Sequence, residues 1–256
     1  MTNHSPKINQ SLGKALELLD LLAEQRKPMS LAALSEAAGF PKSTTHLLLS
    51  TLRSYGYVEQ RPDGRYFLGI RMYECGHVVS SEWDISTVVK PYLEQLAGQT
   101  GASAVATYID GGHIINLEQF AGRSGVQVLS EVGARLPLHA TAQGKLYLSL
   151  QSDADVCSVL RSRGMQAFTP HTLTTQEAVL EQLEQIRKNG YAIENGEYKI
   201  GLRAVCAPVY DRDGRARYAV GVVGLFRYIN SREFDKAIAA TRSCAQQISS
   251  ALGYRL

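Results

Sequence analysis

The 256-residue chain is long enough for two domains, and its 45% hydrophobic and 20% charged residues are typical of a soluble globular protein. Its net charge of +3 is too small to indicate a nucleic-acid partner by itself. Nine Lys and Arg stand against six Asp and Glu between residues 1 and 72, and the positive residues gather between Lys42 and Arg71. Charge alone leaves an ordinary solvated surface and a nucleic-acid interface equally open.

Several classes of protein are disfavoured by what the sequence lacks. No apolar stretch approaches the roughly 20 residues of a membrane span, and the first residues do not resemble a signal peptide. The four cysteines are far apart, which predicts buried free thiols rather than a disulfide framework or a metal site. We therefore expect a cytoplasmic protein without a metal or cofactor.

The first 70 residues carry the signals of three helices and a hairpin. Apolar residues recur at helical spacing, Ser30 is a typical N-cap, and Gly39 and Gly56 are suited to end helices. The segment Pro62-Asp63-Gly64-Arg65 is a strong turn signal. The predicted elements are helices at residues 10–24, 31–38 and 41–55, and strands at residues 57–61 and 66–68.

This order of elements is the plan of a winged helix-turn-helix, whose second helix enters the major groove of DNA. A polar cluster opens the third predicted helix, where a recognition helix reaches bases and phosphates. The alternatives are a helical bundle with an incidental hairpin and, for each residue, plain solvent exposure. The predicted DNA contacts are Lys42, Ser43, Thr44, Thr45, His46, Arg53 and the wing residue Arg65.

The remaining sequence mixes helices and strands. A connecting helix over residues 68–82 carries Ile70, Tyr73 and Val78 on its apolar side, and a further helix covers residues 85–100. The mixture beyond Gly101 predicts an α+β domain with a central, largely antiparallel sheet. Its predicted strands are residues 102–109, 113–120, 126–129, 205–210 and 217–226, and its predicted helices are residues 141–150, 153–163, 175–189 and 231–252.

Three separated segments resemble the IclR family of transcriptional regulators. KALELLDLLAE with LAALSEAAGFPKSTTHLLLSTLRSYGYVEQ is similar to the family's helix-turn-helix. GARLPLHATAQGKLYLS, residues 133–149, and NGEYKIGLRAVCAPVYDRDGR, residues 195–215, are similar to two segments of its effector domain. The order and distances agree, so the resemblance covers nearly the whole chain.

The resemblance implies a winged helix-turn-helix at residues 8–69, with the motif at about 30–50, a linker helix at residues 70–82 and a GAF-like effector-binding domain at residues 83–256. It also implies a homodimer, often a dimer of dimers, that binds double-stranded operator DNA. Such regulators repress or activate catabolic operons in response to small organic acids, aromatic acids or sugar-acid products. We expect repression, the commoner mode in the family; activation is the alternative.

Two departures from the family pattern bear on specificity. The family usually has Arg where this chain has Leu47, which removes a phosphate contact or a guanine contact. Members that bind glyoxylate or pyruvate use a Cys and a Ser-x-Ser pair where this chain has Ala204, Gly221 and Val223. A very small acid depends on several directed hydrogen bonds, so these substitutions favour a larger, partly apolar acid.

The resemblance also points to other effector contacts. Backbone amides at the helix start near Thr141 favour an anion. His139 is open to a structural interpretation as well. The predicted effector contacts are His139, Thr141, Ala142, Gln143, Glu197, Arg203, Ala204, Gly221 and Val223.

Enzymatic and non-DNA-binding functions are the alternatives from other classes. The sequence contains no phosphate-binding loop, dinucleotide fingerprint, zinc-protease motif or nucleophile elbow. Gly122-Arg123-Ser124-Gly125 is only loosely similar to the last of these, and His77, His113 and His171 are isolated, so we expect neither an enzyme nor a metal site. A scaffold or a sensor that does not bind DNA would not need the polar cluster at residues 42–46.

Overall fold

The computed structural model describes residues 9–82, 85–109, 111–122 and 136–255, and it divides into two compact units, Met1–Asp84 and Ile85–Leu256. The strand predicted at residues 126–129 lies outside the described residues. Within them, no helix combines the length and apolar character needed to cross a membrane.

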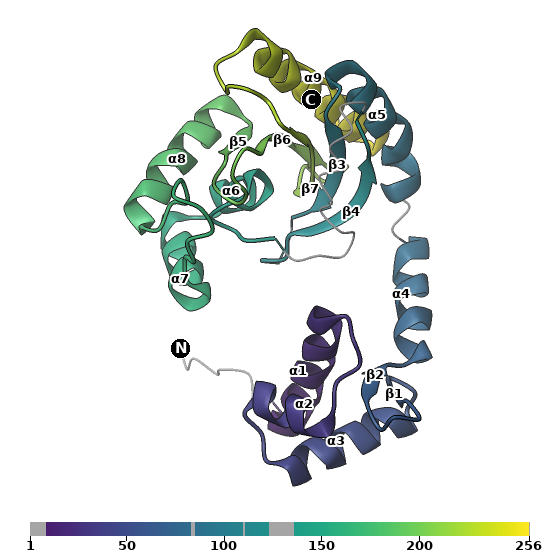
Figure 1. Ribbon diagram of the computed structural model, residues 1–256. Coiled ribbons are helices and arrows are strands. Elements are labelled where there is room, and N and C mark those ends of the chain that lie inside the picture. The colour runs from purple at the N-terminus through teal and green to yellow at the C-terminus, as the bar shows by residue number, and fades with distance from the viewer. Residues whose placement is uncertain (1–8, 83–84, 110, 123–135, 256) are drawn as a thin grey trace, which may run out of the picture. The chain divides into compact units, whose positions relative to one another are not determined.

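The N-terminal unit is a winged helix-turn-helix (Figure 1). Ser30 caps its second helix by accepting a hydrogen bond from the Ala33 amide, and Gly39 ends that helix in the left-handed conformation, as the sequence predicts. Met29 adds a bridge to Tyr66 beside the two-stranded wing. The elements are α1 (Gln10–Gln25), α2 (Leu31–Ala38), α3 (Lys42–Ser54), β1 (Val58–Gln60), β2 (Tyr66–Leu68) and α4 (Ile70–Glu82).

This unit has its own apolar core. Leu18 and Leu22 of α1 are fully buried, together with Leu34 of α2 and Leu49 of α3. Burial of each such side chain stabilises the folded state by about 1.5–3 kcal/mol, so this core fixes α3 against the other two helices. The face of α3 that is turned away from these residues is left to solvent.

The C-terminal unit is an α+β domain around one five-stranded antiparallel sheet of order β4-β3-β7-β6-β5. The strand β5 was not predicted from the sequence. The elements are α5 (Ile85–Thr100), β3 (Ser103–Tyr108), β4 (Ile115–Phe120), α6 (Ala142–Ser149), α7 (Asp153–Arg163), α8 (Gln176–Asn189), β5 (Ala192–Asn195), β6 (Arg203–Tyr210), β7 (Ala216–Gly224) and α9 (Arg232–Ala251).

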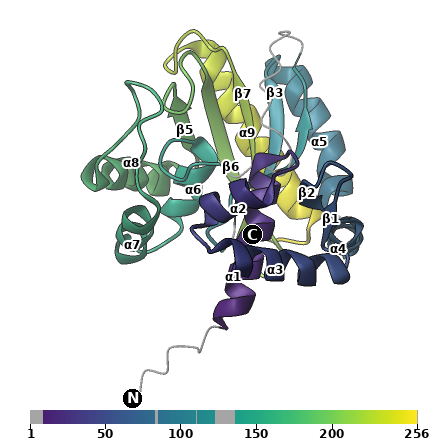
Figure 2. The same cartoon turned by 60° about the horizontal axis from the view of Figure 1, so that its bottom comes forward.

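Helices cover both faces of this sheet, with α5 and α9 on one side and α6, α7 and α8 on the other (Figure 2). Successive residues of a strand point to opposite faces. On β6, Val205 and Ala207 therefore pack with α5 and α9, whereas Ala204 and Cys206 pack with α6 and α8. Each face has a separate apolar cluster, and the cluster under α6 contains Ala204, one of the two residues on β6 predicted for effector binding.

Candidate DNA interface and effector site

The start of α3 presents the polar cluster predicted to contact DNA. Lys42, Ser43 and His46 are exposed, and Thr44 is half-buried. The first residues of a recognition helix reach base edges and phosphates, and the helix N-terminus itself favours phosphate. The structure therefore brings four of the five predicted groove residues to one exposed helix start.

Thr45 is the exception and corrects the sequence prediction. Its side chain is fully buried, and its hydroxyl donates to the carbonyl oxygen of Pro41 at 3.2 Å. Thr45 lies four residues before buried Leu49, on the core side of α3. It therefore supports the helix from inside and is not available to DNA.

Two arginines frame the wing. Arg53 at the end of α3 donates to the side-chain oxygen of Gln60 on β1 at 2.6 Å. Arg65 in the turn of the hairpin is exposed and lies 3.5 Å from the carboxylate of Asp63. Such an exposed pair contributes little to stability, so Arg65 can exchange Asp63 for a phosphate at small cost.

Two of the predicted effector residues, Ala204 on β6 and Val223 on β7, lie side by side. Ala204 of β6 pairs directly with Val223 of β7, and Val223 pairs with Ser103 of β3. On the other side, Ala204 pairs with Glu194 of β5. Directly opposite residues share one face of a sheet, so these four side chains form a row across four strands, under α6, with an apolar middle and polar ends.

The packing of neighbouring strands explains why residue 221 is a glycine, and the sequence alone does not show this. A Cβ atom at this position would lie 2.4 Å from the carbonyl oxygen of Val205 and 2.8 Å from the Cβ of Cys206. No side chain fits there without moving β6. Gly221 is thus required by strand packing and does not by itself indicate a larger ligand, whereas Ala204 and Val223 still do.

The helix α6 begins as expected for an anion site. Thr141 caps it by accepting from the Gly144 amide at 3.1 Å, while its hydroxyl donates to the carbonyl oxygen of Pro137 at 2.7 Å. In the described part of the chain, the amides of Ala142 and Gln143 have no hydrogen-bond acceptor. Ala142 belongs to the same apolar cluster as Ala204, so the start of α6 lies on the sheet face that carries the row.

His139 has a structural role. Its ring is buried, its Nε2 lies 2.9 Å from the carbonyl oxygen of Gln166, and it packs against Phe168. A carbonyl oxygen only accepts, so Nε2 carries the proton of this bond. His139 also lines a cavity of about 210 Å³ beside the end of α7, and that cavity includes no residue of β6 or β7. His139 therefore does not join the row on the sheet.

Glu197 is engaged by a lysine that the sequence analysis missed. Lys145 of α6 is fully buried, and its Nζ lies 2.6 and 2.8 Å from the two carboxylate oxygens of Glu197. Gln182 of α8 accepts a third hydrogen bond at 2.7 Å. The signal in the sequence was a single charged residue in a helix whose other residues are all uncharged. Glu197 is a structural partner of this lysine rather than a free ligand contact.

A second carboxyl lies beside this ion pair. Glu194 is buried and accepts from the amides of Glu197 and Tyr198 at 2.6 and 3.1 Å. Burial raises the pKa of Glu194 to about 7, because loss of water disfavours its charged form more than the hydrogen bonds favour it. Burial also lowers the pKa of Lys145, against the attraction of Glu197.

Arg203 does not turn toward the row. Its Nε donates to the Asn195 side chain at 2.8 Å, and its guanidinium also donates to the carbonyl oxygen of Phe226. Arg203 immediately precedes Ala204 on the strand and points to the opposite face. The structure therefore does not bring Arg203 to the row of Ala204 and Val223, and its role in effector binding stays a prediction.

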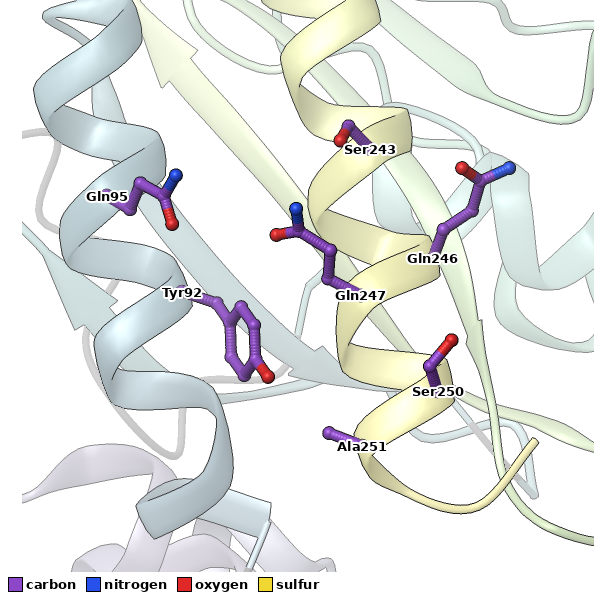
Figure 3. Close-up of a pocket in the computed structure, with 7 residues that line it drawn as sticks. All are labelled: Tyr92, Gln95, Ser243, Gln246, Gln247, Ser250 and Ala251. Atoms are coloured by element: carbon purple, nitrogen blue, oxygen red, sulfur yellow. The ribbon is translucent and has the colours of Figure 1, made fainter. Parts of the chain in front are cut away.

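A groove of about 690 Å³ lies between α5 and α9, on the other side of the sheet (Figure 3). Neutral side chains from both helices line it, and none of them carries a charge that would anchor an acid. The lining residues of the groove are Tyr92, Gln95, Ser243, Gln246, Gln247, Ser250 and Ala251.

Within the described ranges, no cluster of three His, Cys, Asp or Glu side chains could hold a metal ion.

A winged helix-turn-helix with an exposed polar helix start, followed by a unit with a buried sheet face, defines the class of ligand-responsive DNA-binding regulators. Residues 77–250 match the family described as bacterial transcriptional regulator IclR C-terminal, and residues 11–62 match the IclR helix-turn-helix domain. The chain belongs to the IclR family. It is a DNA-binding transcriptional regulator with an effector-binding C-terminal domain, not an enzyme.

Relatives and solved structures agree over nearly the full length. The HTH-type transcriptional regulator XynR of Escherichia coli K12 is 36% identical over 96% of this chain and 98% of its own. The acetate operon repressor of Salmonella typhimurium is 31% identical over 95% and 90%. A putative IclR regulator from Silicibacter sp. TM1040 superposes with a TM-score of 0.85 at 22% identity, covering 96% and 97%.

A further structural neighbour is an IclR homolog from Microbacterium hydrocarbonoxydans in complex with 4-hydroxybenzoate. It superposes with a TM-score of 0.77 at 21% identity, covering 94% of this chain and 98% of that chain. At these identities the structures establish a shared fold.

Proposed function

We propose that this chain is a repressor of a catabolic operon that binds a pseudo-palindromic operator as a homodimer, and that a small organic acid bound in the C-terminal unit modulates this binding. The observation that carries the proposal is the exposed start of α3, with Lys42, Ser43 and His46 in the positions from which a recognition helix contacts DNA. Repression is supported by similarity to the acetate operon repressor.

Dimerisation is supported by apolar side chains that the N-terminal unit leaves in solvent. Leu12 and Leu16 of α1 are 60% and 54% exposed, and Ile70, Tyr73 and Val78 of α4 are 61–71% exposed. Large apolar side chains exposed in this way are typical of surfaces that a partner covers. One recognition helix covers only a half-site, so a dimer also supplies the second helix that an operator requires. A dimer of dimers is a further outcome of the same assembly.

The effector is an acid larger than glyoxylate or pyruvate. The amides of Ala142 and Gln143 are suited to its carboxylate, and the apolar middle of the row, Ala204 and Val223, is suited to an extended or aromatic part. An aromatic acid is supported by the structural neighbour that was solved in complex with 4-hydroxybenzoate.

A gel-shift assay of the full-length protein with the DNA upstream of its own and neighbouring genes tests the regulatory part. We expect a specific complex, and higher expression of the controlled genes after deletion of the regulator. Lower expression after deletion would identify an activator instead. No specific complex with any of these DNA segments would contradict the proposal.

Calorimetry of the full-length protein against a graded series of acids, from glyoxylate and pyruvate to benzoate, 4-hydroxybenzoate and sugar acids, tests the effector. We expect heat from one of the larger acids and none from the smallest. Tight binding of glyoxylate or pyruvate with no response to larger acids would overturn the size argument.

Dimerisation is tested by sedimentation of the full-length protein. Ile70→Glu should shift the sedimentation coefficient toward that of the monomer, whereas the control Lys236→Glu, at an exposed position of α9, should leave it unchanged.

A further inference from the structure

The side of α3 that faces away from the core carries one large apolar side chain. Thr45 and Leu49 are buried and define the inner side of the helix. Leu47 lies on the opposite side and is 67% exposed. Its neighbours one turn away, at helical spacings of three and four, are Ser43, Thr44, Ser50, Thr51 and, a turn further, Ser54. We call these six residues, Leu47 included, the outer face of α3.

The hydroxyl groups of the outer face are partly committed. Thr51 donates its hydroxyl hydrogen to the carbonyl oxygen of Leu47 at 3.0 Å, and Ser54 donates to the carbonyl oxygen of Thr51 at 2.8 Å. A hydroxyl whose hydrogen is engaged can still accept. At these two positions the outer face therefore offers acceptors rather than donors.

The outer face lacks the side chains that read purines most strongly. Guanine is typically bound by Arg or Lys, and adenine by Asn or Gln, through paired hydrogen bonds in the major groove. None of these residue types occurs on the outer face, and the cations Lys42 and Arg53 lie beside it. The one apolar group on the base edges of the major groove is the 5-methyl group of thymine. Leu47 is suited to this group and to no other base feature.

We propose that Leu47 packs against the 5-methyl group of a thymine in each operator half-site and is a specificity-determining residue of this regulator. The inference rests on insertion of α3 into the major groove. Contact removes apolar surface of both the leucine and the methyl group from water, which makes one methyl group worth about a three- to tenfold change in affinity.

Selection of operator sequences from random DNA with the full-length protein, followed by replacement of each thymine by uracil, tests the proposal. Uracil lacks only the methyl group and keeps the base pair. We expect one thymine per half-site at which uracil weakens binding about three- to tenfold, and no comparable loss elsewhere in the half-site. A selected half-site without thymine, or one in which no uracil replacement weakens binding, would overturn the proposal.

The substitution Leu47→Ala, combined with the replacement of thymine by uracil, gives a double-mutant cycle. Because Leu47 is exposed, the variant should keep the melting temperature of the wild type, and it should bind the thymine and uracil operators equally. Ser50→Ala is the matched control on the same face and should keep the preference for thymine. Leu47→Arg should move the selected base at this position to guanine. If Leu47→Ala still distinguished thymine from uracil, another residue would recognise the methyl group and the proposal would be wrong.

The same experiment separates this inference from the proposed function. Enrichment of any operator by the wild type supports DNA binding, whatever base stands opposite Leu47. Failure to enrich any sequence would contradict operator binding and the inference together. Enrichment without a methyl-dependent position would contradict the inference alone.

Discussion

The helices α3 and α6 each begin a candidate binding site, but they differ in what surrounds them. The start of α3 is exposed and polar, and its one buried polar side chain, Thr45, donates to the carbonyl oxygen of Pro41, the residue that caps this helix. All eight residues of α6 are buried, including Lys145, whose partners come from α8 and from the loop after β5. Loss of one contact at the exposed start of α3 should leave the protein folded. Loss of a partner of the buried Lys145 should destabilise the fold, because it leaves a buried charge without compensation.

The largest effect expected from this difference is at Lys145. Lys145→Met leaves the carboxylate of Glu197 buried without a cation, so we expect the free energy of unfolding to fall by about 3–5 kcal/mol. Urea denaturation followed by circular dichroism measures it. Lys236→Met, an exposed lysine on α9, is the control and should change stability by less than about 0.5 kcal/mol. Equal stability of the two variants would show that the buried pair contributes nothing.

The next effect is a dependence of stability on pH that Glu194 introduces. Its pKa is about 7 in the folded protein against an ordinary 4.5, so the folded state binds the extra proton between these values. Stability should therefore be highest at the acidic end of this window and fall as the pH rises through 7, by about 2–3 kcal/mol from this group. Glu194→Gln should remove the decline. A variant with the same pH profile as the wild type would contradict the assignment.

Val223 tests the apolar middle of the row. Val223→Ser places a hydroxyl opposite Ala204, where the larger acid brings no partner, and we expect binding of the acid identified by calorimetry to weaken by about 1–3 kcal/mol. Leu225→Ser, at an exposed position just beyond β7, is the control. Tighter binding to Val223→Ser would indicate a ligand that donates or accepts a hydrogen bond there.

Lys42 and Arg65 should give smaller effects that concern DNA alone. Lys42→Ala and Arg65→Ala should each weaken binding to every sequence alike and lower the salt dependence of the affinity by about one unit of slope. Fluorescence anisotropy at several salt concentrations measures the affinity and its salt dependence. Lys236→Ala, which removes the same single positive charge elsewhere, is the control. Substitution of Thr44 or His46 should instead change the preferred operator. If none of these four substitutions changed affinity or preference, α3 would not be the recognition helix.

The smallest effect contrasts Thr45 with its exposed neighbours. Thr45→Val keeps the shape of the buried side chain and removes its hydrogen bond, so we expect a loss of about 1 kcal/mol in stability and an unchanged salt dependence of DNA binding. A changed salt dependence would place Thr45 at the DNA after all.

The sequence predicted most elements well because their signals are local. The Ser30 cap, turn glycines and the periodicity of apolar residues placed the predicted helices and strands of the described residues within two residues of their observed bounds. The four-residue strand β5 escaped because Glu194 and Asn195 are poor strand formers. Its position follows from pairing with β6, which no local pattern specifies.

The candidate sites were less predictable where burial decides the role. Thr45 lies in line with Leu49 and Leu52 at helical spacing, and this pattern could have placed it in the core. The opposite orientation of Arg203 and Ala204 likewise follows from strand alternation once β6 is known. The partnership of Lys145 with Glu197 joins residues far apart in the sequence, and the packing constraint on Gly221 depends on the neighbouring strand.

The most direct test of the account is hydroxyl-radical footprinting of the full-length protein on a selected operator. Two recognition helices in a symmetric dimer predict two protected half-sites related by a two-fold axis, one helical turn or a whole number of turns apart, with the protein bound as a dimer or a dimer of dimers. Protection of a single asymmetric half-site by a monomer would contradict it.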